Sequence, residues 1–116
     1  MINHIVLLKF KPEVKESDIE DLEKHMDDLP NSIAEIHSYE FGRDVIRSER
    51  SYDFGLIALF ANTEALSRYQ VHPDHLVVVE KVKNMCNSII TVDFEGSDAS
   101  SLKEKTPTSD LIDWQS

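Results

Sequence analysis

Alternating apolar and polar positions predict four β-strands along the chain. The first covers Ile2–Phe10, where Ile, Val, Leu and Phe predominate, and Lys11-Pro12 closes it. Residues 36–43, 52–61 and 87–94 have the same β-branched and aromatic character. The chain therefore supplies enough strands for one small sheet.

Between these strands, apolar residues recur every three or four positions, which predicts amphipathic helices. We expect the first helix to start near Ser17, whose spacing to Glu20 matches a capping box, and to end at Pro30. Its inward stripe consists of Ile19, Leu22, Met26 and Leu29.

A second helical region is interrupted by a proline. Asn62 or Thr63 can cap its first part, and His72-Pro73 breaks the pattern before helical spacing resumes at Asp74. The resulting order is typical of an α+β, ferredoxin-like fold, β-α-β-β-α-β, in which helices cover one face of a four-stranded antiparallel sheet.

The first and third predicted strands are apolar on both faces. Ile5 and Leu7 in one strand, and Ile57 and Leu59 in the other, lie opposite the side chains that would face the helices. Helices on one face leave these aliphatic side chains in water. We therefore expect a homodimer that pairs through the uncovered face, with the C-terminal segment around Trp114 as the alternative cover.

Length and charge limit the class of protein. The chain has 116 residues, a net charge of -10 from 22 acidic and 12 basic residues, and one cysteine, Cys86. We expect one domain over residues 1–95, followed by a polar, flexible tail at residues 96–116. The negative charge disfavours nucleic acid and anionic membranes as partners, and no apolar run is long enough to span a bilayer. Without a recognisable secretory signal or a possible intrachain disulfide, a soluble, cytoplasmic protein is expected.

The candidate chemistry lies between Tyr69 and His75, around the proline break. A histidine such as His75 can act as a general base near neutral pH, and a tyrosine hydroxyl can stabilise growing negative charge on a carbonyl oxygen. Asp93, near the end of the last strand, could hold a histidine ring, and His4 could join from the first strand. This combination suits enolate or aldol chemistry.

From spacing alone, structural roles explain the same residues better. His72 can cap the following helix, Tyr69 can be a core aromatic residue, and Asp93 can close a turn. His72 and His75 also have a metal-binding spacing, but no second ligand pair accompanies them, so we expect no metal. No glycine-rich phosphate loop is present and Cys86 lacks a catalytic partner pattern, so we expect no cofactor.

Three stretches resemble the stress-responsive A/B barrel domain family. They are the opening segment from His4 to Lys11, the Phe41-Gly42 step, and the segment from Tyr69 to His75. The resemblance covers about residues 1–95. It implies a ferredoxin-like domain that forms a dimeric α+β barrel, in agreement with the pairing expected above.

The family includes a polyketide cyclase that closes a linear chain by intramolecular aldol condensation, and the resemblance implies roles for individual residues. The catalytic tyrosine and histidine of that enzyme are similar to Tyr69 and His75, its supporting aspartate to Asp93, and a pocket histidine on its first strand to His4. A pocket tyrosine on its first helix is replaced here by Met26.

These observations lead to one main hypothesis and two alternatives. We expect a homodimer with a small-molecule pocket between helices and sheet, in which His75 abstracts a proton next to a carbonyl, Asp93 orients its ring and Tyr69 stabilises the enolate oxygen. The remaining pocket residues would be His4, Met26 and His72. The alternatives are a non-catalytic, stress-related binding protein and a monooxygenase of the same dimeric barrel architecture.

Overall fold

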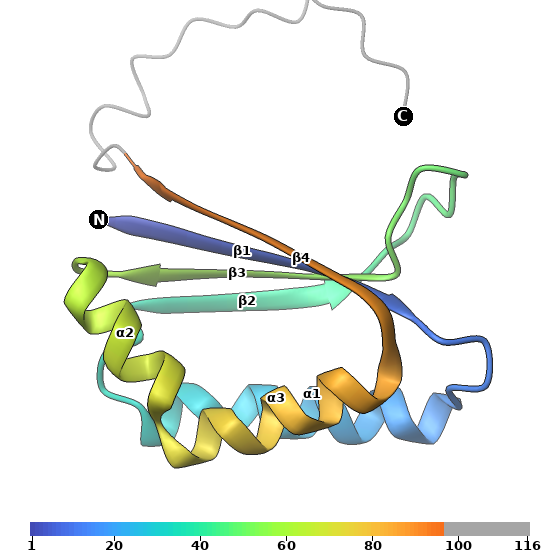
Figure 1. The fold of residues 1–116 in the computed structure, drawn as a ribbon, viewed down its shortest axis with the longest axis horizontal. Coiled ribbons are helices and arrows are strands. Elements are labelled where there is room, and N and C mark those ends of the chain that lie inside the picture. Colours follow the sequence, from blue (N-terminus) through green and yellow to red (C-terminus); the bar gives the residue numbers. More distant parts are fainter. Residues whose placement is uncertain (97–116) are drawn as a thin grey trace, which may run out of the picture.

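The computed structural model describes residues 1–96, which form a sheet covered on one face by helices (Figure 1). The elements are β1 (Ile2–Phe10), α1 (Glu16–Ser32), β2 (Ser38–Arg43), β3 (Phe54–Phe60), α2 (Thr63–Val71), α3 (Pro73–Met85) and β4 (Cys86–Glu95). The strands are antiparallel in the order β2-β3-β1-β4, so the predicted ferredoxin-like arrangement is confirmed. No helix in this part of the chain is both long and apolar enough to cross a bilayer. The segment around Trp114 lies outside the described residues.

β1 lies inside the sheet, with β3 on one side and β4 on the other. In this register His4 is opposite Ala58 of β3 and Asp93 of β4. Because side chains of paired residues point to the same face, all three face the helices. The register therefore brings together two polar residues that are 89 positions apart in the sequence.

The first helix begins earlier than the predicted capping box suggested. Its first residue is Glu16, and the Asp18 carboxylate accepts a 2.9 Å hydrogen bond from the Lys15 N–H. Asp18 therefore fills the position that we had assigned to Glu20.

The prolines act differently in the two helical regions. Pro30 lies inside α1, which continues to Ser32 instead of ending at the proline. The proline removes one backbone hydrogen bond, and the helix extends for only two residues beyond it. Pro73 is the first residue of α3, and Nδ1 of the preceding His72 accepts a 3.1 Å hydrogen bond from the Asp74 N–H. The bipartite second helical region is confirmed.

The hydrophobic core fills the space between the sheet and the helices. Three side chains are fully buried there: Leu22 of α1, and Ala58 and Phe60 of β3. The opposite face of the sheet is uncovered within the described residues. Its exposed apolar side chains are Leu7, Ile57, Ile90, Val92 and Phe94. The predicted apolar second face is confirmed for β1 and β3, and β4 extends it.

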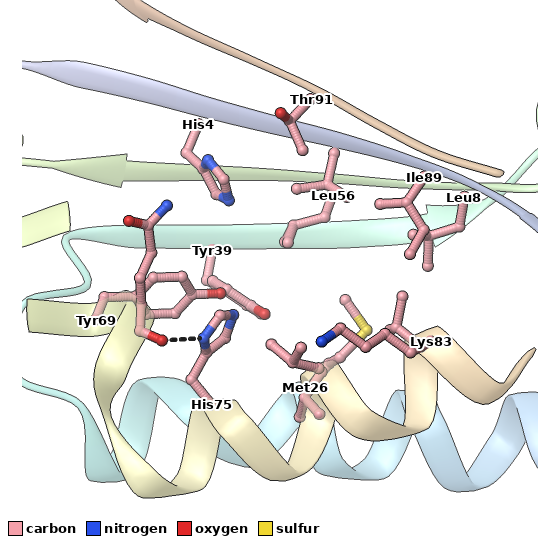
Figure 2. A pocket seen from close by; sticks show the side chains of 15 residues that line it. His4, Leu8, Met26, Tyr39, Leu56, Tyr69, His75, Lys83, Ile89 and Thr91 are labelled. Carbon is pink, nitrogen blue, oxygen red and sulfur yellow. Dashed lines mark hydrogen bonds between the residues drawn. The ribbon is translucent and has the colours of Figure 1, made fainter. Parts of the chain in front are cut away.

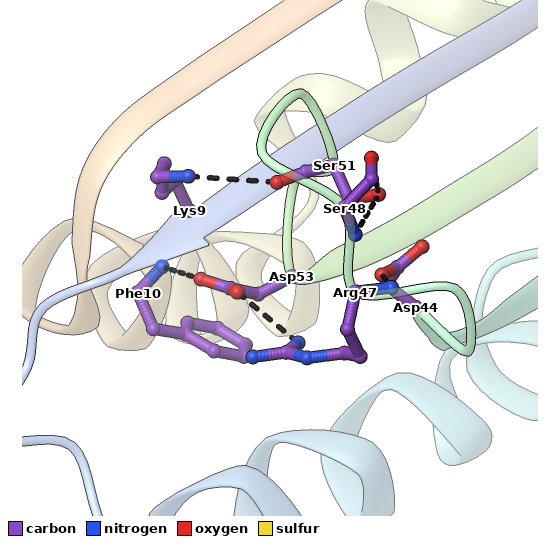
Figure 3. A network of polar contacts seen from close by, with 7 residues as sticks. All are labelled: Lys9, Phe10, Asp44, Arg47, Ser48, Ser51 and Asp53. Atoms are coloured by element: carbon purple, nitrogen blue, oxygen red, sulfur yellow. Dashed lines mark hydrogen bonds and ion pairs between the residues drawn. The ribbon is translucent and has the colours of Figure 1, made fainter. Parts of the chain in front are cut away.

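The loop between β2 and β3 is tied to the end of β1 by Asp53 (Figure 3). Its carboxylate accepts a 2.8 Å hydrogen bond from the Phe10 N–H and forms a 3.3 Å ion pair with the Arg47 guanidinium. Arg47 has a left-handed backbone conformation with φ of 59°, and its N–H donates to the Asp44 carboxylate at 2.6 Å. These contacts hold the loop against the end of β1, where the Asp53 N–H also donates to the Leu8 carbonyl oxygen at 2.9 Å.

Candidate functional site

A cavity of about 310 Å³ lies between the sheet and the helices (Figure 2). Its volume is at the lower end of the range for pockets that take small organic molecules. Its wall is mainly aliphatic, and most of its polar side chains lie around Tyr69 and His75. The lining residues are His4, Val6, Leu8, Met26, Tyr39, Leu56, Tyr69, Gln70, His75, Val78, Val79, Val82, Lys83, Ile89 and Thr91.

His4 is held by Asp93 across the β1–β4 pair. The His4 ring is buried, with 6% of the residue exposed, and its Nδ1 is hydrogen-bonded to the Asp93 carboxylate. An ionised carboxylate only accepts, so Nδ1 carries a proton and donates to it, and Nε2 is the ring nitrogen that remains for other partners. We expected Asp93 to orient His75. The strand register instead places the carboxylate beside His4.

His75, near the start of α3, packs against Tyr69 of α2. Their ring centroids are 4.1 Å apart, and Nδ1 of His75 donates to the Gln70 carbonyl oxygen at 3.2 Å (Figure 2). Because a carbonyl oxygen only accepts, Nδ1 carries the proton and Nε2 is unprotonated. Burial lowers the pKa of His75 below its ordinary 6.5, although the Gln70 hydrogen bond opposes this change. The ring is therefore neutral at pH 7 and can accept a proton.

Two tyrosine hydroxyls lie beside His75. Tyr69 is 1% exposed, and burial raises its pKa, with a further contribution from the neighbouring Tyr39 phenol. Tyr39 projects from β2 toward the helices, and burial raises its pKa as well. The Tyr39 hydroxyl is buried without a hydrogen bond of ordinary geometry to any described residue. Both phenols stay protonated at neutral pH and can donate hydrogen bonds.

The structure brings some of the predicted residues together and leaves others outside. The cavity is lined by His4, Met26, Tyr69 and His75, but not by His72 or Asp93. His72 was expected in the pocket, but its ring nitrogen caps α3 instead. Among residues 1–96, no three His, Cys, Asp or Glu side chains are grouped for metal binding.

Four polar lining residues, Tyr39, Gln70, Lys83 and Thr91, were not identified as pocket residues from the sequence. Lys83 follows His75 by eight positions and falls on the same helical face, so the helical period could have indicated it. The alternation of β2 assigns Tyr39 to a face. It does not indicate that the hydroxyl is left unpaired.

The sequence model of the stress responsive A/B barrel domain matches residues 2–96. The chain is 25% identical over 95 residues to olivetolic acid cyclase of Cannabis sativa, with 80% of this chain and 94% of the cyclase covered.

Two solved structures show the same fold. A dimeric ferredoxin-like protein from Thermobifida fusca has a TM-score of 0.75 at 29% identity, with 80% of this chain and 88% of that chain covered. A hydroxynitrile lyase from Passiflora edulis also has a TM-score of 0.75, at 15% identity, with 84% of this chain and 94% of that chain covered.

Substituting Tyr39 tests whether its hydroxyl lacks a partner in the free protein. We expect Tyr39→Phe to leave the free energy of unfolding unchanged or to raise it by about 1 kcal/mol, because it removes a buried hydroxyl without a hydrogen bond. Tyr52→Phe is the matched control, since the Tyr52 hydroxyl pairs with Ser88 Oγ at 2.9 Å. That variant should lose about 0.5–1.5 kcal/mol in chemical denaturation. Equal losses in both variants would show that Tyr39 has a partner.

Proposed function

The chain belongs to the stress-responsive A/B barrel domain family, and from this we propose that it binds a small carbonyl compound and removes a proton next to the carbonyl carbon. The observation that carries this proposal is the contact of a neutral histidine with a protonated tyrosine at one end of an apolar cavity. A base and a hydrogen-bond donor are the two groups that enolisation requires. The cyclase among the relatives supports a reaction at carbon.

His75 is the proposed base. Its unprotonated Nε2 takes the proton from the carbon next to the carbonyl, and the electron pair of that C–H bond forms the enolate. The Tyr69 hydroxyl donates a hydrogen bond to the carbonyl oxygen, where negative charge grows. The imidazolium then returns its proton to carbon or to the product oxygen. Because burial lowers the pKa of His75, this return is favourable.

His4 has a different role in this proposal. Its ring is fixed by Asp93, and its centroid is 6.1 Å from that of Tyr69. Its Nε2, which is not bonded to Asp93, can form a hydrogen bond with a hydroxyl group of the ligand or with a water molecule. The His4–Asp93 pair would therefore orient the ligand, while His75 carries the proton.

We also propose that the protein is a homodimer that pairs through the uncovered sheet face. Five large apolar side chains are exposed there, from Leu7 in β1 to Phe94 in β4, and no described element covers them. Contiguous apolar patches on this scale mark association surfaces. The similar Thermobifida fusca protein is dimeric.

Hydrogen–deuterium exchange of 2-octanone, followed by NMR in D₂O, tests the proton abstraction. We expect the protein to accelerate exchange at the carbons next to the carbonyl, and His75→Gln to reduce this acceleration by about 100-fold or more. Tyr69→Phe should also slow exchange. His72→Asn preserves the helix cap outside the cavity and should change little. Binding of the ketone without accelerated exchange would favour the non-catalytic binding protein.

The pH dependence of the same exchange identifies the base. A histidine accepts a proton only when it is neutral, and burial places the pKa of His75 below 6.5. The protein-dependent rate should therefore be constant above pH 7 and fall in acid with a midpoint below 6.5. A midpoint above that value would contradict His75 as the base.

A charged substitution on the sheet face tests the dimer. Val92 is 52% exposed, and Val92→Glu should abolish pairing because the carboxylate would be buried without a partner. Sedimentation should then show a change from twice 13.3 kDa to 13.3 kDa. Val71→Glu, at a 70% exposed position on α2, should remain dimeric. A wild-type protein that sediments as a monomer would refute the proposal.

A further inference from the structure

We infer that the ligand is an oxo acid, whose carboxylate binds Lys83 while its carbonyl group lies at Tyr69 and His75. The inference rests on the proposed function, because it names the substrate class of the same site. It is supported by the position of Lys83 and by the absence of Asp and Glu side chains from the cavity lining.

The charge of the lining differs from that of the chain. The protein has 22 acidic residues against 12 lysines and arginines, yet no carboxylate lines the cavity and Lys83 does. Within residues 1–96 the Lys83 amino group forms no ion pair, whereas Lys81 on the same helix pairs with Asp21 at 2.7 Å. An anionic ligand group would meet a cation here without a competing carboxylate.

The spacing along α3 separates the two ends of the cavity. One face of the helix lines the cavity at helical spacing, with aliphatic side chains between the two polar residues. This stripe is His75, Val78, Val79, Val82 and Lys83. At 1.5 Å per residue, eight positions separate the Cα atoms of His75 and Lys83 by about 12 Å along the axis.

Figure 2 shows how the Lys83 side chain spans this separation. His4, Tyr69 and His75 lie together at one end, and the Lys83 side chain extends from its position near the end of α3 toward His75, past Met26. A carboxylate at the Lys83 amino group therefore lies inside the cavity, and the carbonyl group of the same molecule can reach Tyr69 and His75.

The Lys83 cation favours a carboxylate. One ammonium group provides a single positive charge, and no lining arginine offers the paired donors that favour phosphate groups. Lys83 is exposed, so the paired carboxylate stays partly hydrated and avoids the desolvation cost of a fully buried ion pair. The 310 Å³ cavity takes the volume of about ten water molecules, which suits a medium-length chain.

Calorimetric titration with octanoate and 1-octanol tests the acid end without involving the reaction. The two probes share a chain length and differ in charge. Wild type should bind octanoate about three- to tenfold more tightly than octanol at low salt. Lys83→Met should reduce octanoate affinity to that of octanol and leave octanol affinity unchanged, and Lys83→Arg should retain the preference.

Lys81→Met is the matched control, since it removes the same charge from the same helix outside the cavity. It should leave the preference for octanoate intact. Equal affinities of the two probes for wild type, or equal losses in the two methionine variants, would overturn the inference. Accelerated exchange of 2-octanone without acid preference would refute the oxo acid alone. Acid preference that depends on Lys83, without exchange, would instead refute the proton abstraction alone.

Discussion

The pairing of β1 with β3 and β4 is the interaction on which the rest of the structure depends. It places a strand that is apolar on both faces inside the sheet, where its backbone groups are paired on each side. One set of alternate side chains then forms the cavity floor and part of the core, and the other set forms the uncovered face. The same register sets Asp93 beside His4.

The sequence predicted the elements well because hydrophobic spacing reports them directly. It predicted less of the site, because contacts between strands depend on register, which local patterns do not encode. A carboxylate at the end of the last strand could meet either histidine, and only the pairing of β1 with β4 selects His4. The sequence allowed His72 to line the pocket or to cap a helix. In the structure its ring nitrogen accepts a hydrogen bond from the Asp74 N–H, so it caps α3.

One end of the cavity combines neutral polar groups with an apolar wall. At neutral pH the described geometry leaves His75 as an acceptor and both tyrosines as donors, so these three side chains carry little net charge before a ligand binds. In such a site, hydrogen bonds to a developing oxyanion are stronger than in water. A charge that appears only during a reaction is then stabilised selectively, which is the condition for lowering a barrier.

The alternation along β1 also restricts how this sequence can change. A one-residue insertion or deletion within the strand would reverse every side chain beyond it, turning His4 outward and Ile5 inward. Such an event would disrupt the pocket and the outer face together, so point substitutions are the route by which either can diverge. The β2–β3 loop, which Asp53 anchors to β1, can instead vary in length between its anchoring residues.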